Sequence, residues 1–254
     1  MSNTWIIAHF SPTGTTVKVA RAIAEGSGCP VQEIDLSRPV SPEVLGKGDL
    51  LLVAMPVYGG LVPAIALERL AALQGSGQKA VAVAVYGNRA YDNALLQMKD
   101  ELEANGYQVI AAGAFIAEHS IARTIAAGRP DANDLMCAAS FGAEIMKKLA
   151  QGALAPIQVP GDPAYKEQAH RGGSPVHPSA EQGCVGCGVC AKNCPVGAIS
   201  AEALTKAGDP CINCMRCVAM CPQKVRSLPA ERVAAATAML MEKASEPKQP
   251  ALFV

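Results

Sequence analysis

Ten cysteines occur in the 254 residues, and eight of them lie between Cys184 and Cys221. The eight form two runs of one pattern, C-x2-C-x2-C-x3-C-P, which end at Pro195 and Pro222. Three closely spaced thiolates can bind three corners of a cubane iron–sulfur cluster, and a fourth thiolate from a remote position closes the cage. The spacing therefore predicts two [4Fe–4S] clusters and one-electron transfer chemistry.

The same pattern predicts which cysteines share a cluster. In proteins with two such runs, the fourth cysteine of each run ligates the other cluster. The expected ligand sets are Cys184, Cys187, Cys190 and Cys221 for one cluster, and Cys211, Cys214, Cys217 and Cys194 for the other. Zinc binding and disulfides are the alternatives. Zinc sites favour paired Cys or His spacings, and no histidine is interleaved with either run.

A second candidate site follows the first apolar segment, where Ser11-Pro12-Thr13-Gly14-Thr15-Thr16 runs into a predicted helix. Hydroxyls and backbone N–H groups at the start of a helix bind anions, especially phosphate. The loop has no lysine, and no G-x-G-x-x-G follows a strand, so neither a P-loop nor a usual nicotinamide dinucleotide site is predicted. The candidate phosphate ligands of a mononucleotide are Ser11, Thr13, Gly14, Thr15 and Thr16. Routine helix capping by these residues is the alternative.

Two further loops follow predicted strands and carry three of the five tyrosines. In an open parallel sheet, such strand ends meet at the edge where ligands bind. A flat ring system could stack on these tyrosines, and ordinary loop packing is the alternative. The candidate residues are Pro56, Val57, Tyr58, Gly59 and Gly60 in one loop, and Tyr86, Gly87, Asn88, Arg89, Tyr91 and Asp92 in the other.

Predicted strands and helices, which would position these loops, alternate along the first 151 residues. Apolar segments predict strands at 5–10, 31–35, 50–55, 80–85 and 109–116, and the segments between them predict helices at 16–25, 63–73, 92–105 and 133–149. Apolar strands separated by helices favour a parallel sheet covered on both faces. Five strands with right-handed crossovers suit a doubly wound α/β sheet.

The three loops together resemble those of a flavodoxin over about residues 4–151, and the cysteine runs resemble a bacterial ferredoxin with two four-iron clusters over about residues 184–228. The chain as a whole looks like a flavodoxin–ferredoxin fusion. The resemblance implies a five-stranded doubly wound parallel sheet with a small α+β two-cluster ferredoxin-like domain. It also implies FMN as a cofactor, with its phosphate in the first loop and its isoalloxazine between the other two.

Composition changes divide the chain into four expected segments: a flavodoxin-like FMN-binding domain at 1–151, a connector at 152–183, a ferredoxin domain at 184–228, and a C-terminal helix and tail at 229–254. The connector is rich in proline and glycine. We expect either a mobile linker or an ordered strap that lies across both domains and that Ile157, Val159 and Tyr165 would anchor. A helix is predicted at 230–243.

Charge and composition exclude some classes of function. Lys plus Arg and Asp plus Glu both total 22, so the formal net charge is zero. Nucleic-acid binding needs a basic face and is not predicted. The first ten residues do not read as a secretory signal, so a cytoplasmic location is expected. The uncharged run 50–67 is interrupted by Pro56, Gly59, Gly60 and Pro63, and no membrane span is predicted.

The favoured function is electron transfer between the two clusters and FMN, with electrons passing to or from partner redox proteins. An FMN-dependent reductase of a small molecule, fed by the clusters, is the alternative, and a redox sensor is a third. A reductase would need polar groups above the flavin. The candidates are Arg89, His119 and Arg123. His119 and Arg123 follow the fifth predicted strand and could lie there, or they could belong to an ordinary surface loop.

Overall fold

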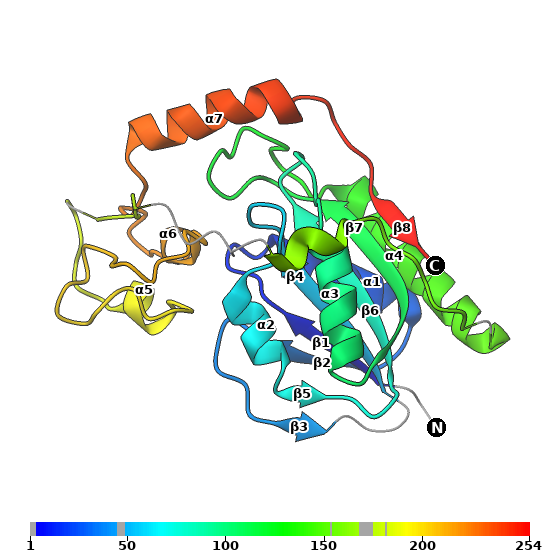
Figure 1. Ribbon diagram of the computed structural model, residues 1–254. Helices are drawn as coiled ribbons and strands as arrows, with labels where there is room; N and C mark the ends of the chain where they lie inside the picture. The colour runs from blue at the N-terminus through cyan, green and yellow to red at the C-terminus, as the bar shows by residue number, and fades with distance from the viewer. Residues whose placement is uncertain (1–3, 45–48, 153, 168–174, 181) are drawn as a thin grey trace.

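The computed structural model describes residues 4–44, 49–152, 154–167, 175–180 and 182–254. An α/β domain occupies the N-terminal part, and the cysteine-rich segment lies beside it (Figure 1). A long helix, α7 (Ala230–Ala244), leads from the cysteine-rich segment back to the α/β domain. The α/β domain and the cysteine-rich segment therefore lie against each other, and α7 connects them.

The central sheet contains five parallel strands, which match the predicted segments to within one residue at each end. They are β1 (Trp5–His9), β2 (Val31–Asp35), β4 (Leu50–Pro56), β6 (Lys79–Tyr86) and β7 (Gln108–Ile116). A sixth strand, β8 (Ala251–Phe253), pairs antiparallel with β7 and was not predicted. The sheet order is β2-β1-β4-β6-β7-β8.

The order of the five parallel strands confirms the predicted fold class. Numbered among themselves they run 2-1-3-4-5, which is the flavodoxin-like order of doubly wound sheets. The order reverses between β1 and β4, and ligands bind outside the carboxyl ends of the strands at such a switch point. The three candidate loops after β1, β4 and β6 all start at this edge.

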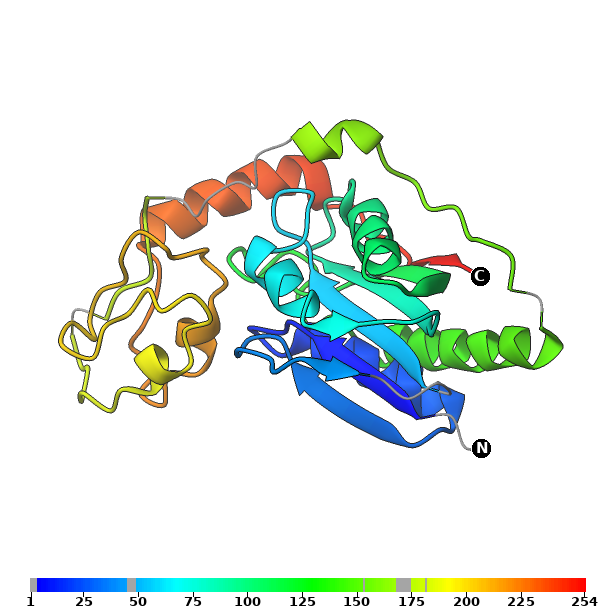
Figure 2. The same cartoon turned by 60° about the horizontal axis from the view of Figure 1, so that its bottom comes forward.

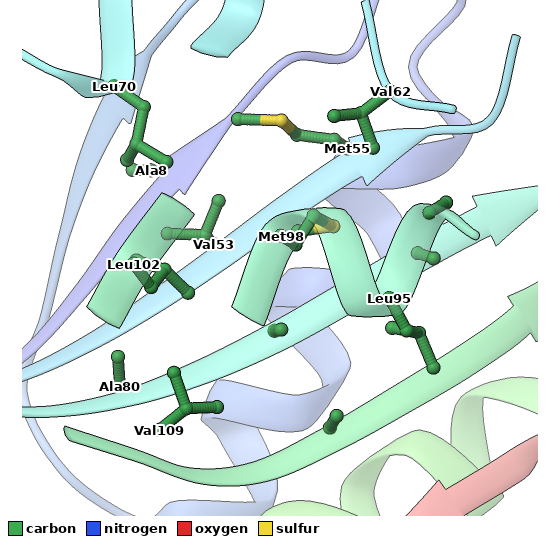
Figure 3. Packing of buried hydrophobic residues seen from close by; sticks show 14 of the residues in the cluster. Ala8, Val53, Met55, Val62, Leu70, Ala80, Leu95, Met98, Leu102 and Val109 are labelled. Carbon is green, nitrogen blue, oxygen red and sulfur yellow. The ribbon is translucent and has the colours of Figure 1, made fainter. Parts of the chain in front are cut away.

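Helices cover both faces of the sheet (Figures 1 and 2). One face packs against α1 (Thr15–Ser27) and α4 (Ala132–Gln151), and the other against α2 (Ala64–Leu70) and α3 (Ala94–Ala104). In Figure 3, Leu95, Met98 and Leu102 of α3 lie over strands that carry Val53 and Ala80. The four strands β1, β4, β6 and β7 are almost entirely buried and mostly apolar, as a sheet covered on both faces requires. The edge strand β2 differs, since it is partly exposed and contains Gln32, Glu33 and Asp35.

The run 50–67 forms β4, a loop and the start of α2. Among the residues that the structure describes, no helix combines the length and apolar character needed to cross a bilayer. The helix predicted to reach residue 73 ends at Leu70. Leu73 belongs instead to a short strand, β5 (Leu73–Gln74), which pairs with β3 (Glu43–Val44).

Residues 154–167 of the connector form an ordered strap along the α/β domain. Ile157 and the ring of Tyr165 are buried, and Tyr165 Oη donates a hydrogen bond to Asp100 Oδ2 of α3 at 2.9 Å. Tyr165 lies in a 3-10 helix, η1 (Pro163–Glu167). This part of the connector is ordered on the α/β domain, while residues 153, 168–174 and 181 lie outside the described ranges.

The cysteine-rich segment contains two short helices, α5 (Val189–Lys192) and α6 (Arg216–Ala219), and an antiparallel bridge between Ser179 and Ser227. From there α7 reaches the α/β domain, where Leu240 packs with Ala122 and Ile125. The tail that follows is held by the buried Asn88, whose Nδ2 donates to the carbonyls of Ala244 at 2.6 Å and Glu246 at 2.9 Å.

Two arginines join the parts directly. Arg216 of α6 donates to Ser37 Oγ at 3.0 Å and pairs with Asp35 at 3.4 Å. Arg69 of α2 donates to the carbonyl of Leu36 at 2.8 Å and to that of Pro195 at 2.5 Å. Arg216 lies between two cysteines of the second run, so this contact fixes that run against the carboxyl end of β2.

Packing of α1 on α4 requires a glycine. An ideal Cβ on Gly142 would lie 1.9 Å from the backbone oxygen of Ile23, so Gly142→Ala must push the helices apart. Alanine favours a helix by about 1 kcal/mol, but overpacking costs about 1–3 kcal/mol. We therefore expect Gly142→Ala to unfold at a lower temperature than the wild-type protein, as measured by circular dichroism. Ser140→Ala, on the exposed face of α4, is the control and should lower the unfolding temperature less. Equal unfolding temperatures for the two variants would contradict this packing.

Candidate functional site

A cavity of about 410 Å³ opens at the carboxyl edge of the sheet. Its size falls within the range of small-molecule sites. Nine of the residues predicted to bind FMN line it: Thr13, Thr15, Thr16, Pro56, Val57, Tyr58, Gly59, Tyr86 and Gly87. The cavity thus draws on all three candidate loops.

The first loop combines hydroxyls with the start of α1. Gly14 is the N-cap residue, has a φ of 89° and provides no side-chain cap. The hydroxyls of Thr13 and Thr15 lie 3.5 Å apart. Ser11 has a different role, because its buried Oγ accepts the N–H of Val17 at 3.0 Å. Exposed hydroxyls beside a helix N-terminus suit the phosphate of a mononucleotide.

The later loops supply aromatic and glycine surfaces. Burial raises the pKa of the Tyr58 hydroxyl well above its ordinary value, and the nearby Cys214 thiol adds to this shift. Tyr86 lies on the cavity wall, and Tyr91 packs edge-on against it with ring centroids 5.6 Å apart. An ideal Cβ on Gly87 would lie 2.5 Å from His119 Cδ2. The loop after β6 can therefore approach the loop after β7, which carries His119, only because residue 87 is a glycine.

Several predicted cofactor residues do not line this cavity: Ser11, Gly14, Gly60, Asn88, Arg89, Tyr91 and Asp92. Asn88 holds the C-terminal tail, as described above. Arg89 pairs with Asp92, and an ideal Cβ on Gly60 would lie 2.7 Å from Asp92 Oδ2. Residues 88–92, in the loop after β6, thus hold the C-terminal tail and the loop after β4 in place.

His119 lies on the cavity wall, and Arg123 does not. The Nδ1 atom of His119 accepts the N–H groups of Ile121 at 3.2 Å and Ala122 at 3.0 Å. Burial lowers the pKa of the imidazole, so the ring is neutral near pH 7 and its proton is on Nε2. Arg123 is exposed and pairs with Glu118.

Several cavity residues were missed by sequence reasoning, and three of them come from outside the α/β domain. Ile212 and Asn213 come from the second cysteine run, and Arg232 comes from α7. Asn213 has a φ of 49°, which turns the chain between Cys211 and Cys214. No local pattern indicates that these residues approach the sheet edge, since their position depends on how the two parts pack.

The eight clustered cysteines surround two small cavities of about 20 Å³ each. One is lined by Cys184, Cys187, Cys190 and Cys221, and the other by Cys194, Cys211, Cys214 and Cys217. These two groups are named cage one and cage two. Within the described ranges, no three His, Cys, Asp or Glu side chains are placed to hold a single metal ion.

The surroundings of each cage suit an iron–sulfur cluster. Cage two is bordered by apolar Val196, Ile199 and Ile212, and burial raises the pKa of Cys214 to about 12. A bound metal removes such a proton outright. For Cys221, burial opposes ionisation, but backbone N–H groups of residues 223–226 hold its thiol pKa below the ordinary value. N–H groups aimed at sulfur are a common feature of cluster sites.

Cage two and the large cavity share a wall. Ile212 and Asn213 line both, and Tyr58 of the large cavity lies close enough to Cys214 for the two to interact electrostatically. Cage one is more open, since Cys184 and Cys187 are exposed. The two cages therefore differ in their neighbours: one adjoins the cavity, and the other adjoins solvent.

Comparison with known proteins gives two sequence matches. A family model described as a 4Fe–4S binding domain matches residues 181–200. Over 63 residues the chain is 41% identical to a component of the ion-translocating oxidoreductase complex of Methanosarcina acetivorans, a match that covers 24% of each chain. The aligned region thus spans about a quarter of the length of this curated relative.

Several solved structures are similar to the N-terminal part. A flavodoxin from the domain Archaea is 18% identical with a TM-score of 0.42, covering 58% of this chain and 99% of its own. Flavodoxin 1 from Bacillus cereus is 19% identical with a TM-score of 0.45, covering 57% and 98%. Rubredoxin oxygen:oxidoreductase from Desulfovibrio gigas is 16% identical with a TM-score of 0.43, covering 61% and 38%.

The strand order and the family match lead to one conclusion about the organisation of the molecule. The chain joins an α/β domain of flavodoxin-like topology to a cysteine-rich part that contains a 4Fe–4S binding domain.

Proposed function

We propose that the protein transfers electrons between two [4Fe–4S] clusters and FMN, and passes them to or from partner redox proteins. The clusters would be held in cage one and cage two, and FMN in the 410 Å³ cavity. The observation that carries the proposal is the wall of Ile212 and Asn213 that cage two and the cavity share. Redox centres on either side of this wall would be neighbours.

The chemistry of the two cofactors makes their combination useful. A cluster exchanges single electrons, whereas FMN, when bound, accepts one or two. Holding both in one chain makes their encounter intramolecular, which raises the effective concentration of donor at acceptor. The contacts of Arg216 and Arg69 across the interface support this arrangement, since they fix the distance between the parts.

Exposure favours cage one as the end that meets partner proteins. Cys184 and Cys187 are exposed, and Val185 between them is 65% exposed. Cys211 and Cys214 of cage two are buried, with 8% exposure each. A partner could therefore approach the thiolates of cage one closely, while those of cage two are accessible mainly from within the molecule.

A reductase is a second candidate, and one observation favours it. His119 presents a neutral ring on the cavity wall, so its Nε2–H could donate a hydrogen bond to a small substrate above the flavin. The carrier proposal predicts that reduced protein is reoxidised by small organic acceptors without saturation. Stopped-flow kinetics that saturate with one acceptor, and lose saturation in His119→Gln, would favour the reductase.

Cofactor content tests the proposal directly. Protein isolated without air and reconstituted should contain about eight irons and about eight acid-labile sulfides per chain, as two cubane clusters require, together with bound FMN. Iron, sulfide and flavin analyses measure this. Fewer than about six irons per chain would contradict two cubanes.

The crossed ligation can be tested with the same protein. Cys194→Ala and Cys211→Ala should disturb the same cluster and give similar electron paramagnetic resonance spectra, because both line cage two. Cys221→Ala should disturb the other cluster. Cys137→Ala, in α4, is the control and should leave both signals intact. Matching spectra for the Cys194 and Cys221 variants would contradict the assignment.

The phosphate site can be tested through flavin affinity. Thr13→Ala and Thr15→Ala each remove a hydroxyl at the start of α1. A hydrogen bond to a charged group contributes about 1.5–3 kcal/mol, so we expect the dissociation constant of FMN to rise by roughly 10- to 100-fold. Fluorescence titration of flavin-depleted protein measures it. Ser11→Ala, whose hydroxyl accepts from Val17, should affect stability more than affinity; full affinity in both threonine variants would refute this site.

A further inference from the structure

Arg226 is buried between the two cages, with 3% exposure. Its Nη1 donates to the Leu204 carbonyl at 2.6 Å and lies 3.9 Å from Cys190 Sγ of cage one. Its Nη2 donates to the Pro178 carbonyl at 3.0 Å. Burial raises the pKa of the Cys217 and Cys211 thiols of cage two, and the nearby Arg226 charge opposes this shift. Cys190 and Cys217 are the third cysteines of their runs and lie in α5 and α6.

No carboxylate compensates this charge among the residues that the structure describes: the ion pairs found there do not include Arg226. Its Nε is buried and lacks a hydrogen-bond partner in the same set of residues. Burying a charge without a counter-charge is costly. The groups near Arg226 that can carry negative charge are the cysteine sulfurs, which are thiolates when they ligate a cluster.

The internal repeat shows that the arginine belongs to one half only. Arg226 follows Cys221 by five residues, and Ile199 follows Cys194 by the same interval. Both side chains are buried, and each lines the cage to which the preceding fourth cysteine contributes. Isoleucine therefore fills this position adequately in one half, so packing alone does not require an arginine in the other.

We propose that Arg226 is an electrostatic positioning residue for both clusters: its buried charge stabilises their reduced states and raises both reduction potentials. This inference rests on the proposed function, since it presupposes the clusters. Each reduction adds one electron, taken from an external one-electron donor protein, and so adds one negative charge close to the guanidinium. Arg226 itself forms and breaks no bond in this step.

The test compares variants of the holoprotein by redox titration followed by electron paramagnetic resonance. Arg226→Ile copies the residue of the other half, and both midpoint potentials should fall by at least about 59 mV, a tenfold change for one electron. Arg226→Lys retains the charge and should recover most of the shift. Lys192→Gln removes an exposed charge two residues from Cys190 and should leave both midpoints nearly unchanged, because solvent screens it.

Each outcome either supports or overturns the proposed electrostatic role of Arg226. Unchanged midpoints in an Arg226→Ile protein with full iron content would overturn the inference. If Arg226→Ile loses iron and Arg226→Lys keeps it, a positive charge is required at this position, as inferred. Loss of iron from both would overturn it, because the geometry of the hydrogen bonds to Leu204 and Pro178 would then be the requirement. A wild-type protein without two clusters would instead refute the proposed function.

Discussion

The arrangement of this molecule depends on the fixed contact between the second cysteine run and the carboxyl edge of the sheet. Arg216 lies between Cys214 and Cys217 and reaches Ser37 and Asp35, so the segment that would hold a cluster also fastens the two parts together. Electron exchange needs centres that stay close, and this partly buried ionic contact holds the two parts in one orientation. The same contact places Ile212 and Asn213 on the cavity wall.

The α/β domain supplies the other half of this arrangement through its topology. A doubly wound sheet brings the loops after β1, β4 and β6 together at the point where strand order reverses. Its inner strands are covered on both faces, and the loops extend this core to the sheet edge, where Val57, Val62 and Tyr91 pack against it beside the cavity. The close approach of Gly87 to His119 shows how tightly the neighbouring loops pack around this edge.

Much of this organisation could be predicted from the sequence, because it depends on local patterns. Apolar runs indicated the parallel strands β1, β4, β6 and β7, and the spacing of the cysteines indicated the two groups that the structure brings together. The roles of Asn88 and Ser11 could not be inferred, since their partners are backbone groups whose positions follow from the tertiary fold. The three residues of β8 were missed because so short a segment has no visible alternation, and its pairing with β7 is non-local.

The antiparallel strand β8 also changes how the cysteine-rich part is attached. The chain remains on the α/β domain as far as η1, passes through both cages, and returns through α7 to the outer edge of the same sheet. Topologically, the cluster-bearing unit is an insertion with two anchors. A unit hung from a single hinge could swing away to meet its partners. Here the two chain connections and the contacts of Arg216 and Arg69 all oppose such a movement, so the orientation of the cysteine-rich part is set within the chain itself.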